Sequence, residues 1–297
     1  MIKSKNVFVC IGALHYDYLL KLKKNILNYR TNPISQETKI GGVAYNVAKL
    51  LSLYSKVDFY TLKIPAQLKK EINNKNIMIH QLNNKNLERY YVALSNNKNK
   101  FILGLANTDV YEKKIDLDIK NKIEKKNIIL DLNLSKIFIN KIIKKLSQNN
   151  KIIICATSVH KVYKIKNIIK KIDLIFLNNA ELKKLTNSQN LILGIKKLLK
   201  KNKNITVCVT NGKKNVIFAN KKIITKIKPP KILIKNENGA GDALAAMMIN
   251  LISLNYSHVE ALKYSVACGS YYASGKNLKN INDFIKIKKL SKKMLIG

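Results

Sequence analysis

Short runs rich in valine, isoleucine and phenylalanine alternate with longer amphipathic segments, and this alternation constrains the fold most strongly. The apolar runs predict strands at 7–11, 57–61, 128–132, 151–155, 174–177, 205–210 and 216–219. Helical periodicity predicts helices at 44–54, 138–147, 162–171, 180–185, 191–201, 243–254 and 258–273. Strands that alternate with helices are typical of a parallel sheet covered on both faces. The sequence therefore predicts an α/β fold, a three-layer sandwich around a mainly parallel sheet.

Two stretches interrupt this alternation. The first follows the first predicted strand and is polar and irregular, and the second predicts a hairpin around a turn at 95–99. Excursions of this kind from an α/β core are candidates for a small lid over a site. We find no internal repeat and no linker. We therefore expect one domain over 1–297, with a small β-lid contributed by about 13–40 and 88–105.

The chain is strongly basic. Among its 297 residues, 56 lysines and arginines oppose 17 acids, which gives a net charge of +39. Such a charge raises nucleic acid as a partner, but only Arg30 and Arg89 are arginines, the residue type that reads bases and phosphates bidentately. The lysines are scattered among asparagine and isoleucine, which share A/T-rich codons. We expect no specific nucleic-acid partner, and a lysine-rich nucleic-acid-binding protein is the alternative from another class.

Cysteine usage and hydropathy bear on the compartment. Each cysteine lies in an apolar stretch without a C-x-x-C partner, at Cys10, Cys155, Cys208 and Cys268. Unpaired, buried thiols are typical of a reducing compartment. No apolar run approaches the ~20 residues that span a bilayer. We therefore expect a cytoplasmic protein with no membrane partner.

The most informative segment is Gly239-Ala240-Gly241-Asp242, directly before an apolar helix. A glycine-rich turn at a helix start leaves backbone N–H groups unpaired, and with the helix dipole these form an anion hole. Glycine-rich helix starts with aspartate are common as plain caps. The helix that follows, however, is apolar nearly all round, so it must be central and buried. We expect these four residues to be catalytic, with Asp242 as the general base toward a substrate hydroxyl.

That arrangement has the division of labour of a kinase, in which positioning and electrostatics supply most of the catalysis. The chain contains no G-x-x-x-x-G-K-[ST] motif and no G-x-G-x-x-G after its first strand. It is therefore neither a P-loop enzyme nor a typical dinucleotide-binding protein.

The segment from Asn236 to Asp242 resembles the D/N-x-x-G-A-G-D signature of the ribokinase-like (PfkB) sugar and nucleoside kinases. Three further family signatures occur in the same order along the chain. They are the pair Gly41-Gly42 with Asn46 after a strand that leads to Asp17, the N-x-x-E pattern of Asn178 and Glu181, and the V-T-x-G pattern of Thr210 and Gly212. Taken singly, each is also compatible with a turn, a hinge or a helix cap.

The resemblance implies roles for these residues. Substrate binding falls to Asp17, Gly41, Gly42 and Asn46, nucleotide binding to Asn178, Thr210 and Gly212, and water-mediated Mg²⁺ binding to Glu181. Aspartate and asparagine suit sugar hydroxyls because they accept, or both donate and accept, hydrogen bonds. The implied cofactors are ATP and Mg²⁺. The resemblance leaves open a monovalent-cation requirement and a homodimer formed through the lid.

Softer cues resemble the family members that phosphorylate pseudouridine. These are Thr31-Asn-Pro33, Asp131-Leu-Asn133-Leu-Ser135 and the asparagine at 236. The implied reaction moves the γ-phosphate of ATP to the 5′-hydroxyl of pseudouridine. Ribose, adenosine or another sugar or nucleoside are the alternative acceptors, and the asparagine at 215, where the family has glycine, keeps open a protein that binds ligand without turnover.

Overall fold

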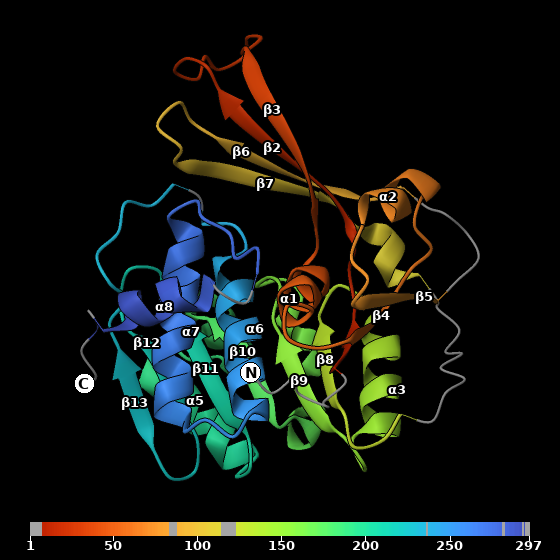
Figure 1. The fold of residues 1–297 in the computed structure, drawn as a ribbon, viewed down its shortest axis with the longest axis vertical. Helices are drawn as coiled ribbons and strands as arrows, with labels where there is room; N and C mark the ends of the chain where they lie inside the picture. Colours follow the sequence, from red (N-terminus) through yellow and green to blue (C-terminus); the bar gives the residue numbers. More distant parts are fainter. Residues whose placement is uncertain are drawn as a thin grey trace.

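The computed structural model describes residues 8–82, 88–113, 123–235, 237–280, 283–292 and 294. Among them, nine strands form one large sheet in the order β13-β12-β11-β10-β9-β8-β1-β4-β5 (Figure 1). These strands are β1 (Phe8–Ile11), β4 (Val57–Thr61), β5 (Ile77–Gln81), β8 (Asn127–Asp131), β9 (Lys151–Cys155), β10 (Leu174–Asn178), β11 (Thr206–Thr210), β12 (Val216–Ala219) and β13 (Ile224–Ile227). From β11 across the sheet to β5 all neighbouring strands are parallel, and β12 pairs antiparallel with both β11 and β13.

The central strands are buried on both faces. In β1, Phe8 and Cys10 belong to one apolar cluster, and Val9 and Ile11 belong to another. A strand that meets apolar groups on both sides needs a continuous apolar run rather than an alternating one. This is why the core strands stand out in the sequence.

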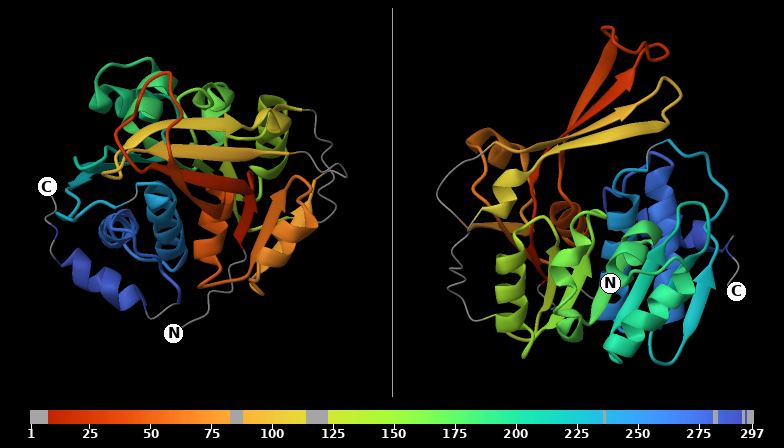
Figure 2. Two further views of the ribbon diagram at one scale, coloured as in Figure 1. Left: turned by 90° about the horizontal axis from the view of Figure 1, so that it is seen from above. Right: turned by 180° about the vertical axis from the view of Figure 1, so that it is seen from behind.

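Helices cover the two faces as separate layers (Figure 2). The first cluster contains residues of α1 (Val43–Leu51), α2 (Ala66–Glu71), α6 (Ala240–Ser253), α7 (His258–Ala273) and α8 (Phe284–Ser291). The second contains residues of α3 (Lys136–Leu146), α4 (Asn179–Thr186) and α5 (Leu191–Lys201). The predicted three-layer α/β architecture is confirmed. Within the described residues, every helix is too short or too polar to cross a bilayer.

One predicted helix was wrong. The segment 162–171 forms two short 3₁₀ helices, η2 (Val162–Ile165) and η3 (Ile169–Lys171). Its buried residues are Val162, Lys164, Ile165, Ile168 and Ile169. The spacing of Val162, Ile165 and Ile168 matches the three residues per turn of a 3₁₀ helix, whereas Val162, Ile165 and Ile169 also have the spacing of an α-helix, so the sequence pattern fits both.

A second sheet stands over the carboxyl ends of the parallel strands (Figure 1). Its order is β3-β2-β6-β7, from β2 (His15–Leu22), β3 (Ile34–Gly41), β6 (Tyr90–Ser95) and β7 (Phe101–Asn107), and η1 (Asp109–Glu112) follows it. The predicted hairpin is confirmed as β6–β7. The polar stretch expected to be irregular is instead a regular antiparallel pair, β2–β3. It is ordered because β2 also pairs in parallel with β6, where Tyr18 and Tyr90 meet edge to face.

Candidate active site

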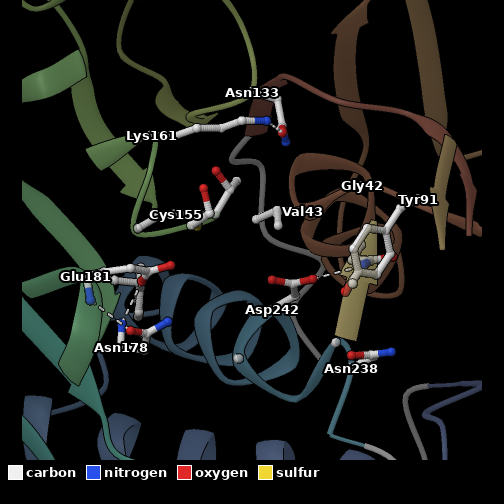
Figure 3. Close-up of a pocket in the computed structure, with 18 of the residues that line it drawn as sticks. Gly42, Val43, Tyr91, Asn133, Cys155, Lys161, Asn178, Glu181, Asn238 and Asp242 are labelled. Atoms are coloured by element: carbon white, nitrogen blue, oxygen red, sulfur yellow. Dashed lines mark hydrogen bonds between the residues drawn. The ribbon is translucent and has the colours of Figure 1, made fainter. Parts of the chain in front are cut away.

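A cavity of about 720 Å³ lies between the two sheets. Its floor includes the last residues of three neighbouring parallel strands, Cys155 of β9, Asn178 of β10 and Thr210 of β11. Open α/β sheets bind ligands outside the carboxyl ends of their strands, so this is where a site is expected. Figure 3 shows Asp242 near the centre of the cavity, between Tyr91 on one side and Glu181 on the other.

Asp242 lies in the first turn of α6 and lines the cavity. Its Oδ2 accepts a hydrogen bond of 2.8 Å from Nδ2 of Asn46 in α1. Burial raises the pKa of Asp242 to about 7, helped by the charges of Asp131 and Asp17 and opposed by the Asn46 hydrogen bond. A carboxyl group with a pKa near 7 is suited to general-base catalysis at neutral pH.

The turn before α6 has the shape of an anion site. Gly239 is the N-cap residue with φ 78°, in the left-handed region that favours glycine. A Cβ added to Gly239 or Gly241 would meet nothing within 4 Å, so open space lies in front of both residues. The amide of Ala240 donates to the Glu237 carbonyl at 3.3 Å, which commits it to the turn. The N–H groups of Gly241 and Asp242 come next in the first turn, and both residues line the cavity.

The opposite wall comes from β2 and the β3–α1 junction. Asp17 lines the cavity from β2, and its Oδ1 lies 3.1 Å from Nδ1 of His15. Gly41 leaves room for this carboxylate, because a Cβ there would lie 2.0 Å from Asp17 Oδ2. Gly42 has φ 107°, and a Cβ there would lie 2.3 Å from the Ala13 carbonyl. The two glycines therefore let the β3–α1 junction pass close to the Asp17 carboxylate and to the Ala13 carbonyl.

Asn178 and Glu181 form the capping box of α4. The Glu181 amide donates to Asn178 Oδ1 at 2.9 Å, and the Asn178 amide donates to Glu181 Oε2 at 2.8 Å. Both residues also line the cavity. Burial raises the pKa of Glu181, opposed by the Asn178 amide. The N-x-x-E pattern thus starts a helix and presents a carboxylate to the cavity at the same time.

The remaining predicted residues divide between the cavity and its surroundings. Thr210 lines it, whereas in the described part of the chain Gly41, Ala240 and Gly212 lie outside the lining. Gly212 has φ 56° in the exposed turn after β11, with open space around it. Asn236, the first residue of the signature, lies outside the described residues.

Lys161 and its partners line the cavity without having been predicted from the sequence. Its Nζ donates to Asn133 Oδ1 at 2.7 Å and to Thr108 Oγ1 at 3.3 Å. Burial lowers the pKa of Lys161, and the charge of Asp131 opposes that shift. One lysine among 54 carries no signal of its own, and Asn133 entered the sequence analysis only within a cue to the acceptor.

Asp131 connects three chain segments beside the cavity by hydrogen bonds. This fully buried carboxylate accepts hydrogen bonds from the amides of Ala13 at 2.8 Å, Ala44 at 3.2 Å and Asn133 at 2.9 Å. Ala44 lies in the first turn of α1, so Asp131 caps the helix that carries Asn46. A Cβ on Gly12 would lie 2.4 Å from the carboxylate, which explains the glycine at that position.

The donor set suits a hydrated Mg²⁺. Among the described residues, no group of three histidines, cysteines or acids is placed to enclose a metal ion. Four carboxylate residues line the cavity, and among them Glu181 and Asp242 come from the starts of α4 and α6. Mg²⁺ keeps several waters and is commonly bound through one or two carboxylates and substrate phosphates. These residues therefore fit a metal that arrives with a nucleotide.

Fold and cavity together define an α/β enzyme of the class that binds its ligands at the carboxyl ends of a parallel sheet. The family model described as pfkB family carbohydrate kinase matches residues 5–283. The chain belongs to this family, and its activity is that of a kinase. No curated protein matches the sequence.

Solved structures share the fold at low identity. A carbohydrate kinase from Agrobacterium tumefaciens is 20% identical, with a TM-score of 0.76 over 98% of this chain and 100% of that one. Ribokinase from Cryptococcus neoformans in complex with ADP is 12% identical, with a TM-score of 0.77 over 97% and 99%. Phosphofructokinase-2 from Escherichia coli, in complex with substrates and products, is 17% identical, with a TM-score of 0.75 over 96% and 99%.

Proposed function

We propose that this protein transfers the γ-phosphate of ATP to the 5′-hydroxyl of pseudouridine. The observation that carries the reaction class is Asp242, held by Asn46 at the start of α6 and facing a cavity shared by both sheets. In the proposed step, Asp242 takes the proton of the 5′-hydroxyl while that oxygen attacks the γ-phosphorus. The bond from the γ-phosphorus to the bridging oxygen breaks, and ADP leaves.

The other residues take complementary roles. The amides of the Gly239–Asp242 turn, other than the committed amide of Ala240, stabilise the transferring phosphoryl group, and Asp17, Gly42 and Asn46 position the sugar. Asn178, Thr210 and Gly212 bind the nucleotide, and Glu181 orders water around Mg²⁺. When bound with ATP, Mg²⁺ neutralises charge on the phosphates.

Pseudouridine is favoured among acceptors by the cues around Thr31 and Asp131 and by the chemistry of the cavity. Asn133 and Lys161 supply an amide and an ammonium group to the cavity. Both can hydrogen-bond the carbonyl groups of a base, which a free sugar lacks. Ribose and adenosine are the alternatives.

The test is ADP release by the purified protein with pseudouridine, uridine, adenosine, ribose and fructose 6-phosphate, in sodium and in potassium salts. We expect the highest kcat/KM with pseudouridine. Faster turnover of another acceptor would transfer the assignment to that acceptor, and no turnover with any of them would refute the proposed reaction.

We further propose that the second sheet is a lid over the cavity, within one domain. Tyr91 of β6 and Gly104 and Ala106 of β7 line the cavity from above. Burial and the charge of Asp17 raise the pKa of Tyr91, so its hydroxyl stays a neutral donor toward a bound substrate.

The face of this lid that points away from the cavity is apolar, and we propose that it forms a homodimer. Strand register aligns two apolar rows across β2, β6 and β7, Tyr18, Val92 and Leu105, and then Leu20, Leu94 and Leu103. On β3 these rows continue with the polar residues Thr38 and Gln36. Leu103 is 38% exposed and Leu105 is 59% exposed. Apolar sheet faces usually pack against a partner. Light scattering should give twice the chain mass for the wild type. The double variant Leu103→Lys plus Leu105→Lys should be a monomer. The control Ile137→Lys, on α3, should remain a dimer.

The four cysteines support a cytoplasmic location, which we also propose. All four are free and buried in the structure. Thiols persist unpaired in a reducing compartment.

A further inference from the structure

Arg89 is one of only two arginines in a chain with 54 lysines. Lysine is therefore the ordinary basic residue of this chain. Arg89 is 6% exposed, whereas Arg30 is exposed and its guanidinium donates to the Tyr29 carbonyl at 3.4 Å. A buried arginine in such a chain indicates a geometry that an ammonium group does not satisfy.

The contacts of Arg89 show that geometry. Its Nε donates to the Leu14 carbonyl at 3.0 Å and to the Tyr111 hydroxyl at 2.9 Å. Its Nη1 donates to the Lys63 carbonyl at 3.0 Å, and its Nη2 donates to the Leu62 carbonyl at 3.1 Å. Three nitrogens of one planar group therefore reach acceptors on three separate segments. Lysine presents its donors from a single atom and cannot span them.

Tyr111 completes the arrangement. Its hydroxyl donates to the Leu14 carbonyl at 3.0 Å and accepts hydrogen bonds from the Leu14 amide at 3.0 Å and from Arg89. The hydroxyl thus uses its one donor and both of its acceptor sites. Tyr111 and Leu14 are fully buried. We call Leu14, Arg89 and Tyr111 the hinge node.

The hinge node lies where the lid joins the core. Leu14 directly precedes β2, Arg89 directly precedes β6, and Tyr111 lies in η1, which follows β7. Three of the four chain crossings between the two sheets therefore meet in one hydrogen-bonded cluster. Leu62 and Lys63, which follow the core strand β4, connect that cluster to the large sheet.

We infer that Arg89 is a positioning residue that sets the angle of the lid and thereby places the acceptor-binding side chains over Asp242. Asp17 comes three residues after Leu14, and Tyr91 comes two residues after Arg89. These two cavity residues are direct partners in the parallel β2–β6 register. A shift at the hinge node therefore moves both together. The inference rests on the proposed function where it is tested by kinetics, and on the fold alone where it is tested by amide hydrogen exchange.

The kinetic test compares Arg89→Lys with the matched control Arg30→Lys. Arg89→Lys removes hydrogen bonds that the guanidinium group makes at the hinge node, so Asp17 and Tyr91 lose part of their positioning. We therefore expect the KM for the acceptor to rise about tenfold. The KM for ATP and kcat should stay within about twofold, because the anion site and Asp242 belong to the core. Arg30→Lys should leave all three values unchanged.

The second readout is amide hydrogen exchange, which needs no substrate. In Arg89→Lys we expect faster exchange in β2 and β6 and unchanged exchange in β9 and α6. If the wild type phosphorylates no acceptor, the proposed function fails while exchange still tests the hinge node. Unchanged exchange in the lid, or an equal rise throughout the chain, would overturn the inference. Should Arg89→Lys not fold, Tyr111→Phe removes one hydroxyl with the ring retained and carries the same expectations.

Discussion

In the large sheet, β1 is buried at every residue, whereas β7 of the lid is exposed at every residue. The core strands are held by apolar groups on both faces. The lid strands are held by cross-strand pairing and, at their base, by the hinge node. Both parts line the cavity, with Asp242 and the turn before it in the packed core and Asp17 and Tyr91 in the lid. In the proposed reaction, the general base therefore belongs to the core, and Asp17 and Tyr91 belong to the part with fewer packing contacts.

The largest expected effect separates chemistry from folding. Asp242→Asn removes the general base, so kcat should fall about 10³-fold. Burial raises the pKa of Asp242 from 3.8 to about 7, so the fold loses stability as the pH rises from about 4 to about 7, and the full penalty is present at pH 8. The neutral amide should therefore leave the Tm equal or higher at pH 8. Steady-state rates and thermal unfolding measure the two effects. A variant with near-normal kcat would remove Asp242 from the base role.

The next prediction compares the same substitution in the two sheets. Ile129 in β8 is fully buried, and Ile102 in β7 is 39% exposed. Ile129→Ala should lower the free energy of unfolding by about 2–5 kcal/mol, and Ile102→Ala should change it by less than about 0.5 kcal/mol. Urea denaturation gives both values. Equal losses would mean that the lid is packed as tightly as the core.

A third prediction concerns pH. With a pKa of about 7, Asp242 is protonated below that pH, so kcat/KM should fall about tenfold per pH unit on the acid side. The Asn46 hydrogen bond lowers this pKa, so Asn46→Ala should move the inflection to higher pH. The pH profiles of the two proteins provide the comparison. An inflection that stays in place or moves to lower pH would contradict the proposed electrostatics.

The smallest expected effect lies in the lid. A Cβ at Gly104 would lie 2.3 Å from the Tyr91 hydroxyl, so Gly104→Ala should displace that ring. We expect the KM for the acceptor to rise about threefold with kcat unchanged, because only substrate binding is affected. Initial-rate kinetics over a range of acceptor concentrations measure this change. A fall in kcat with constant KM would place Tyr91 in the chemical step instead.

The sequence predicted the core far better than the lid, and the reason is periodicity. Strands buried on both faces and amphipathic helices leave strong patterns, so the seven predicted strands all recur in the large sheet. The strand β3 is polar and mostly exposed, and β2 is half-buried. They form because β6 pairs with β2 from 74 residues away in sequence and β3 pairs with β2 in turn. That pairing leaves no local pattern. The 3₁₀ segment was mistaken for an α-helix because three-residue and four-residue spacings overlap over ten residues.

The candidate site divides in the same way. The chain itself determined the glycine-rich start of α6, the capping box of Asn178 and Glu181 and the paired glycines, because each is a local backbone requirement written in consecutive residues. Only the tertiary structure decided that Asn46 meets Asp242, that Lys161 is the one lysine of the described residues to line the cavity, and that Arg89 joins three chain crossings. These contacts join residues distant in sequence, and their energy depends on burial and direction, which one-dimensional patterns do not encode.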